Sequence, residues 1–188
     1  MIKKFFTELD DNPIICGIKN AEDLELVIKN KCKIIFVLYG NILNINYIVN
    51  KLHNHDKIVF VNVDLIDGFS SKDIILEYLK EHTSIEGILS SKASLIKSAN
   101  NLGFLTIHRL FVIDSFSFFN IQKQVSISKP TCIEILPGCM PKVLSWIQDK
   151  TDIPLIAAGL VCEKEDVVAA LGAGCIAISS TNHNVWDM

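Results

Sequence analysis

The sequence predicts an α/β fold, a (β/α)8 TIM-type barrel that is trimmed at its C-terminus. Short β-branched apolar runs alternate with longer helical patterns from residue 13 to the end of the chain. Runs such as KIIFVLY (33–39) and PLIAA (154–158) are apolar on both faces, which is typical of parallel strands covered by helices. The strand pattern occurs eight times, and eight βα units favour closure into a barrel. An open, doubly wound sheet is the structural alternative.

Each predicted strand is a short apolar run, and in chain order the strands are expected at 13–18, 33–39, 57–63, 85–89, within 104–112, and at 131–136, 154–158 and 175–179. Helical patterns separate them at 21–30, 45–52, 72–80, 92–101, 115–124, 141–150 and 163–171. Asn20 is the expected N-cap of the first helix, and Ser70 or Ser71 that of the third. Gly103 is placed to end the fourth helix, and Pro141 suits a first helical turn.

The length of the chain bears on how the barrel closes. The chain has 188 residues, fewer than the ~250 typical of this fold, and only residues 181–188 follow the last strand. Eight residues are too few for a full closing helix, so a partner subunit could cover the last gap. A homodimer is therefore one possible assembly. With 49% hydrophobic residues the chain can bury a core without metals or disulfides, so we expect one barrel domain over residues 1–188.

Charge and cysteine content exclude several classes of protein. The formal net charge is −3, which provides no global attraction to a nucleic acid. The six cysteines form no CxxC pair, and we expect buried, reduced thiols and no metal site. No apolar run approaches the ~20 residues that cross a bilayer, which predicts a cytoplasmic protein without a membrane partner. The zinc-protease, P-loop and dinucleotide motifs are absent, so no cofactor is expected.

The last two strands end in residues suited to phosphate. Gly159 follows strand seven, and Ser179 and Ser180 end strand eight, at the strand ends that most often hold phosphate in this fold. A glycine lets backbone N–H groups approach an anion, and a short helical turn from Thr181 would add its positive end. Lys19, after strand one, is a natural second contact. Ordinary turn chemistry and a solvated strand end are the alternatives.

Arg109 is the only arginine, against 17 lysines. It lies in an otherwise apolar stretch, IHRLFVID, where a charge needs a partner, and Asp114, Glu134 or a ligand could supply one. Together with Asp64, these two acids are the carboxylates best placed for acid/base work or for binding ligand hydroxyls. Each could instead be a structural counter-ion.

Several segments in the same order carry a resemblance to a known family. They are VNVDLIDGFSSKD (61–73), IHRLFVIDS (107–115), IEILPG (133–138), IPLIAAGLV (153–161) and LGAGCIAISS (171–180). From about Pro13 to Trp186 the chain resembles the glycerol uptake operon antiterminator regulatory protein family. The resemblance implies a barrel-fold regulator rather than an enzyme. Its members sense glycerol 3-phosphate and, when loaded, bind the messenger RNA leader of glycerol-utilisation genes so that transcription passes a terminator.

The resemblance also implies roles for particular residues. The phosphate would be held by Gly159, Ser179 and Ser180, and the rest of the pocket would be lined by Asp64, Arg109 and Glu134. Gly138 is also expected to contact the ligand, and we expect the loops after the third and sixth strands to order around it. The chain departs from the family pattern at Asn62, where His is usual, at His108, where Gln is common, and at Ala158, where Gly is expected. These departures bear on ligand affinity more than on fold.

Two other functions remain open. The first is a barrel enzyme acting on a small sugar phosphate or glycerol phosphate, with Asp64 and Glu134 as a carboxylate pair. The second is a barrel that serves only as an assembly module.

Overall fold

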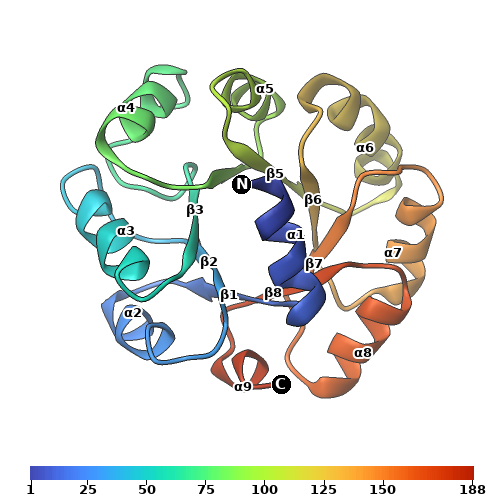
Figure 1. Ribbon diagram of the computed structural model, residues 1–188. Helices are drawn as coiled ribbons and strands as arrows, with labels where there is room; N and C mark the ends of the chain where they lie inside the picture. Colours follow the sequence, from blue (N-terminus) through green and yellow to red (C-terminus); the bar gives the residue numbers. More distant parts are fainter.

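Eight parallel strands form one closed barrel in the computed structural model, which describes residues 1–188 (Figure 1). Each strand pairs with its neighbours in chain order, and β8 closes the ring against β1. The predicted (β/α)8 barrel is therefore confirmed, and the open-sheet alternative is wrong. The strands are β1 (Ile14–Ile18), β2 (Ile34–Val37), β3 (Ile58–Asn62), β4 (Gly87–Ser90), β5 (Leu105–Phe111), β6 (Cys132–Leu136), β7 (Leu155–Ala158) and β8 (Ala177–Ser180).

Helices surround the barrel, and most follow the predicted ranges. They are α2 (Ala21–Val27), α3 (Ile45–His53), α4 (Ile74–His82), α5 (Ala93–Asn101), α6 (Ser115–Ser128), α7 (Pro141–Gln148) and α8 (Lys164–Gly172). The side chain of Asn20 caps α2 as predicted, accepting a hydrogen bond from the Asp23 N–H at 2.8 Å. The predicted Ser cap of α4 is wrong, because α4 begins after Asp73 and has no side-chain cap. Gly103 follows α5 with φ +86°, a left-handed conformation that ends the helix.

The strand side chains form two kinds of core. One cluster lies inside the barrel and joins strands from all sides, for example Ile15, Phe60 and Ile156. Two larger clusters lie between the strands and the surrounding helices. Because successive residues of a strand point to opposite faces, every second residue faces the barrel axis. This alternation decides which polar side chains can point into the interior of the barrel.

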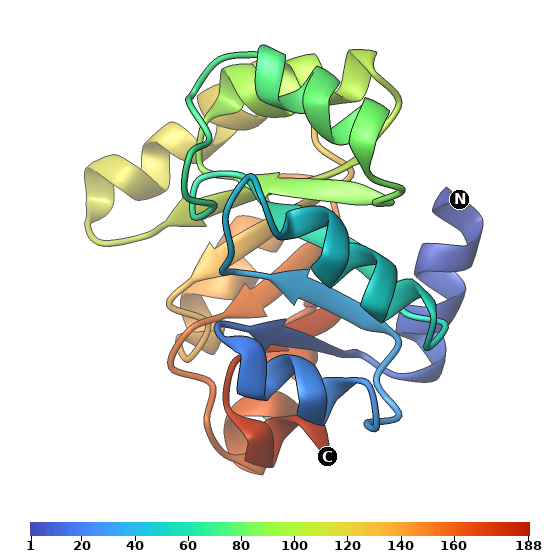
Figure 2. The same cartoon turned by 90° about the vertical axis from the view of Figure 1, so that its left-hand side faces the viewer.

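The helix α1 (Ile2–Asp11) lies across the N-terminal end of the barrel (Figures 1 and 2). Phe5 and Leu9 are 1% and 3% exposed and belong to the cluster inside the barrel. The ring of Phe5 lies 5.2 Å from that of Phe60. The βα alternation does not predict this helix, because it precedes the first strand. The apolar residues Ile2, Phe5 and Leu9 nevertheless have helical spacing, which is the signal that could have found it.

A single helical turn, α9 (His183–Trp186), follows β8 and lies between α2 and α8 (Figure 1). The Trp186 indole is 2% exposed, and its Nε1 donates to the Ser180 carbonyl at 2.8 Å. The expected C-terminal trimming is confirmed, since four residues stand in place of a full helix. Val185 and Trp186 are buried and cover the gap within the same chain.

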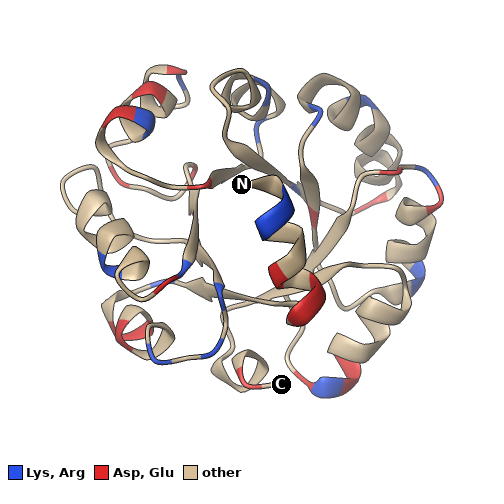
Figure 3. Ribbon diagram, in the orientation of Figure 1, with Lys and Arg blue, Asp and Glu red and all other residues tan.

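The distribution of surface charge and the burial of the cysteines agree in part with what the sequence predicts. Basic and acidic residues are intermixed around the barrel (Figure 3), as the small net charge indicates. Four of the six cysteines are buried, whereas Cys139 is half-buried and Cys162 is exposed. No helix is long and apolar enough to span a membrane.

The closure of the barrel by α1 can be tested with Phe5→Ala. Removing a buried ring from a core that cannot collapse costs about 3–5 kcal/mol, so we expect the free energy of unfolding to fall by that amount in urea titrations. The control Ile2→Ala alters a residue on the same helix that is 53% exposed. It should change stability by less than about 0.5 kcal/mol. A similar effect of both substitutions would contradict the closure of the barrel by the buried side of α1.

Candidate functional site

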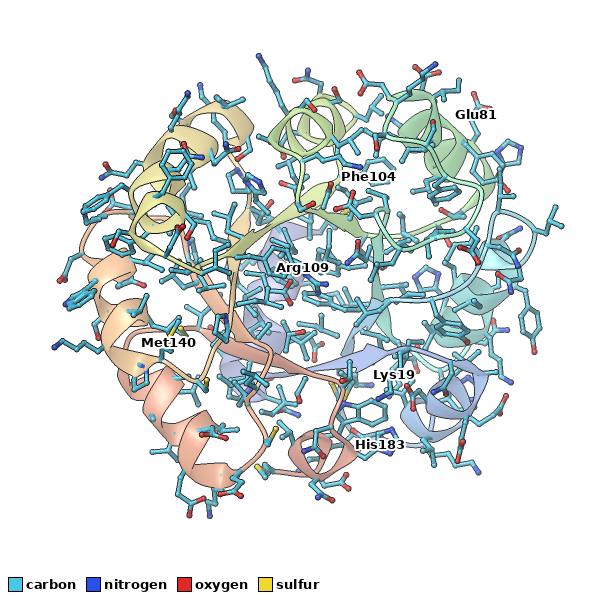
Figure 4. All side chains as sticks on the ribbon, turned by 180° about the vertical axis from the view of Figure 1, so that it is seen from behind. Lys19, Glu81, Phe104, Arg109, Met140 and His183 are labelled. Atoms are coloured by element: carbon cyan, nitrogen blue, oxygen red, sulfur yellow. The ribbon has the colours of Figure 1, made fainter.

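A cavity of about 260 Å³ opens at the C-terminal rim of the barrel. It is lined by Leu38, which directly follows β2, and by residues from the ends of β5, β6, β7 and β8 and the loops that follow the last two. Arg109 lies near the centre of the barrel opening when the rim is viewed directly (Figure 4). The predicted residues Arg109, Glu134, Gly159, Ser179 and Ser180 all line this cavity.

Strand parity brings Arg109 and Glu134 together inside the barrel. Leu105 and Ile107 belong to the interior cluster, and Arg109 is the next residue of β5 with the same orientation. Glu134 follows the interior residue Cys132 in the same way, and the strand register sets Glu134 directly opposite Arg109. The Arg109 Nε donates to Glu134 Oε2 at 2.5 Å. Of the two acidic residues that could pair with Arg109, Asp114 and Glu134, it is therefore Glu134 that forms the ion pair.

The other candidate partner, Asp114, has a different role. Its carboxylate accepts a hydrogen bond from the Ser117 N–H at 2.7 Å and caps α6. Hydrogen bonds from the backbone and side chain of Ser117 hold the pKa of this exposed carboxyl below its ordinary value.

The ion pair, whose two residues line the cavity, leaves hydrogen-bonding atoms unused. The Glu134 side chain is fully buried, and its Oε1 has no hydrogen-bond partner. Arg109 uses only Nε, so its two terminal nitrogens make no hydrogen bond within the chain. A buried unsatisfied polar atom costs roughly 1–3 kcal/mol. A ligand hydroxyl could donate to Oε1 and accept from the guanidinium at the same time.

A second polar surface of the cavity consists of backbone N–H groups. Those of Gly159, Leu160, Val161 and Thr181 make no hydrogen bond within the chain, and all four residues line the cavity. Gly159 and Leu160 have φ angles of +70° and +56°, so two consecutive residues are left-handed. The hydroxyl of Ser179, which is 5% exposed, also has no partner within the chain. Converging unpaired N–H groups of this kind form an anion-binding concavity.

Ser180 and Gly138 support this concavity by tying its loops together. The Ser180 hydroxyl donates to the Val161 carbonyl at 3.2 Å and accepts from the Asn182 N–H at 3.1 Å. Gly138 does not line the cavity, and its N–H donates to the carbonyls of Ala158 at 2.6 Å and Gly159 at 2.9 Å. A Cβ at position 138 would lie 2.6 Å from the Ala158 nitrogen, so only glycine fits there.

Lys19 and Asp64 lie on the rim but do not line the cavity. Lys19 is exposed at the end of β1, and its N–H donates to Asp23 at 2.8 Å. Asp64 accepts hydrogen bonds from the Ser90 hydroxyl at 2.9 Å and the Ser91 N–H at 2.6 Å. Burial would raise the pKa of Asp64, but the hydrogen bonds from Ser91 and Ser90 and the nearby Lys92 ammonium outweigh it and lower the pKa. Asp64 and Glu134 therefore do not form a carboxylate pair in this cavity.

The three departures from the family pattern lie in different places. Ala158 lines the cavity, and Asn62 is 2% exposed at the end of β3, with its Oδ1 accepting from the Asp64 N–H. His108 does not line the cavity, because its parity in β5 turns it outward toward α6. Its Nδ1 lies 2.8 Å from the Ser128 hydroxyl. The apolar cavity residues Leu38 and Leu136 were not predicted, although alternation along β2 and β6 could have indicated them.

Comparisons with known proteins identify similar chains over almost the whole length. The family model described as "Glycerol-3-phosphate responsive antiterminator" matches residues 14–186. The uncharacterized protein YgcP of Escherichia coli (strain K12) is 51% identical over 180 residues, which cover 96% of this chain and 94% of YgcP.

Two solved structures are also similar. The glycerol uptake operon antiterminator regulatory protein of Listeria monocytogenes has a TM-score of 0.90 at 28% identity, covering 93% of this chain and 95% of that one. A glycerol uptake operon antiterminator-related protein of Thermotoga maritima has a TM-score of 0.81 at 25% identity, covering 93% and 98%.

The position of His108 predicts how stability depends on pH. Burial lowers the pKa of His108, despite opposing effects of the Ser91 carbonyl and the Asp64 charge. Below pH ~6.5 the unfolded chain binds a proton at this residue that the folded protein excludes, so stability falls as the pH drops. We expect His108→Gln to lose less stability than the natural chain between about pH 7.5 and pH 5.5 in urea titrations. The exposed His55→Gln is the control, and equal slopes for all three proteins would refute the role of His108.

Proposed function

Because the chain belongs to the glycerol-3-phosphate responsive antiterminator family, we propose that it is a regulator that binds glycerol 3-phosphate in the rim cavity. In its loaded state it binds a messenger RNA leader, so that transcription of glycerol-utilisation genes passes a terminator. Such an RNA target places the protein in the cytoplasm. The proposal rests above all on the buried Glu134 Oε1, which has no partner within the chain.

The two polar surfaces of the cavity match the two ends of this ligand. The unpaired N–H groups of Gly159, Leu160, Val161 and Thr181 and the Ser179 hydroxyl would hold the phosphate. The Glu134 Oε1 and the free nitrogens of Arg109 would bind the glycerol hydroxyls. At about 260 Å³ the cavity lies below the ~300–1,000 Å³ that hold drug-sized ligands, which fits a small metabolite.

The remaining predicted residues act on the ligand mainly through the loops. Ser180 and Gly138 hold the loops after β7 and β8 in the conformation that presents the free N–H groups. Asp64 fixes the start of the loop after β4. Lys19, exposed on the same rim, adds positive charge near the mouth of the cavity. Inside the cavity the Arg109 charge is already balanced by Glu134, so the phosphate depends on dipoles and on charge at the mouth.

Ligand binding can be tested by thermal unfolding with glycerol 3-phosphate. A ligand at 100 times its dissociation constant adds about 2.7 kcal/mol to the free energy of unfolding. We expect Ser179→Ala to weaken binding roughly 10-fold or more, because a hydrogen bond to a charged group contributes about 1.5–3 kcal/mol. Ser126→Ala, on the exposed side of α6, is the matched control. Absence of any shift with the natural chain at millimolar ligand would count against the proposal.

In the same assay, Glu134→Gln distinguishes binding of the glycerol hydroxyls from binding of the phosphate. Its loss of charge should reduce the affinity for glycerol 3-phosphate more than the affinity for inorganic phosphate, which can occupy only the N–H surface. Equal losses for both ligands would contradict the assignment of the hydroxyls to Glu134.

RNA binding can be tested by titrating a labelled leader of a glycerol-utilisation transcript at low salt. The net charge of −3 makes phosphate neutralisation weak, so we expect binding only with glycerol 3-phosphate and a shallow dependence on salt. Ser179→Ala should need more ligand for the same RNA affinity. Binding that is independent of the ligand, or turnover of the ligand into a product, would contradict a ligand-responsive regulator.

A further inference from the structure

The barrel closes between β1 and β8, and this seam lies beside the candidate cavity. Cys16 of β1 pairs with Ser180 of β8, and the next residue, Thr181, lines the cavity. Only residues 181 and 182 separate β8 from α9. The contacts that fix the start of α9 therefore also restrict where the Thr181 N–H group lies.

One buried carboxylate joins the two sides of this seam. The Asp23 side chain is 2% exposed, and its Oδ1 lies 2.8 Å from Nε2 of His183, the first residue of α9. Its Oδ2 accepts a hydrogen bond at 2.8 Å from the N–H of Lys19, which directly follows β1. Because an ionised carboxylate can only accept, the His183 ring nitrogen is the donor. Figure 4 shows Lys19 and His183 on the same side of the rim.

The surroundings of His183 indicate that it positions the loop and does not fill the seam. Its side chain is 48% exposed, whereas Val185 and Trp186 are 0% and 2% exposed and already cover the gap between α2 and α8. The His183 ring lies against the Trp186 indole, with ring centroids 4.5 Å apart. A buried carboxylate that loses a hydrogen-bond donor is left unsatisfied, so the bond to Asp23 restrains the start of α9.

Gly17 restricts the position of Thr181 from the other strand of the seam. Ile15 belongs to the interior cluster, and Gly17 is the next residue of β1 with the same orientation. A Cβ at position 17 would lie 3.1 Å from Cγ2 of Thr181 and 3.2 Å from Cδ1 of Leu38, and both of these residues line the cavity. These distances are shorter than ordinary carbon contacts, so Thr181 can lie this close to β1 only because residue 17 has no side chain.

We infer that Asp23 and His183 are positioning residues for the phosphate end of the cavity, because their hydrogen bond holds the loop that carries the Thr181 N–H. The inference rests on the proposed function and extends it to residues that do not line the cavity. The two residues act through Thr181. Gly159, in the loop after β7, is held instead by a hydrogen bond from the Gly138 N–H to its carbonyl.

The test compares His183→Leu with His183→Gln, whose side-chain amide can donate from nearly the position of Nε2. The backbone amide resonances of the full chain are followed while glycerol 3-phosphate or inorganic phosphate is added. We expect His183→Leu to bind both about 10-fold more weakly, which corresponds to the loss of one hydrogen bond to a charged group. His183→Gln should regain most of this affinity. In His183→Leu the Thr181 amide should no longer respond to either anion, while the Gly159 amide still responds.

Two further variants complete the test. Asn184→Ala is the matched control, because Asn184 is exposed on the same helical turn and its side chain makes no hydrogen bond within the chain. It should bind like the natural chain. Gly17→Ala crowds Thr181 from β1 and leaves Asp23 and His183 unchanged, so it should also reduce the response of the Thr181 amide. Urea unfolding of each variant without ligand checks that the chain is folded.

The inference is overturned if His183→Leu binds as tightly as the natural chain, or if His183→Gln binds no better than His183→Leu. Loss of the Thr181 and Gly159 responses together would also overturn it, because the substitution would then loosen the whole site. A natural chain whose Thr181 amide responds to inorganic phosphate but not to glycerol 3-phosphate would contradict only the proposed ligand. A natural chain whose Thr181 amide responds to neither anion would overturn both.

Discussion

The polar interior of this barrel depends on the ion pair between Arg109 and Glu134. Both charges lie inside the ring of strands, where removal of one partner from a buried pair costs about 3–5 kcal/mol. The register of β5 and β6 sets the two residues opposite each other, so the closed sheet itself fixes the pair. Each side chain keeps unused hydrogen-bonding atoms, and a polar ligand that reached them would complete a network that the chain leaves incomplete.

The surroundings of the pair consist of a packed apolar base and of loops that are joined by hydrogen bonds. Below it, the interior cluster fills the barrel with side chains such as Phe36 and Phe60, whose rings lie 5.5 Å apart. Above it, the loops after β7 and β8 are joined through Ser180 and through Gly138. These hydrogen bonds, together with the buried Val161, fix the conformation in which the loops present their backbone N–H groups.

The sequence predicts the fold well because apolar runs such as 33–39 report burial on both faces, and eight of them restrict the topology. It does not predict α1, which breaks the alternation. Among the site residues, Gly159, Ser179, Arg109 and Glu134 line the cavity as their strand ends suggested. Gly138 and Asp64 hold loops instead, because residue type at a strand end does not reveal which hydrogen bonds a loop makes. His108 shows the same limit, since its outward orientation depends on parity within β5.

The helix α1 has a consequence for how fast a ligand can exchange. With Phe5 and Leu9 filling the far end of the barrel axis, the rim cavity is blind-ended, and solvent cannot pass through it. A bound metabolite enters and leaves by one mouth alone. Any macromolecule bound across that mouth would lengthen the residence time of the metabolite without touching it. The rate at which the metabolite dissociates would then depend on whether the macromolecule is bound.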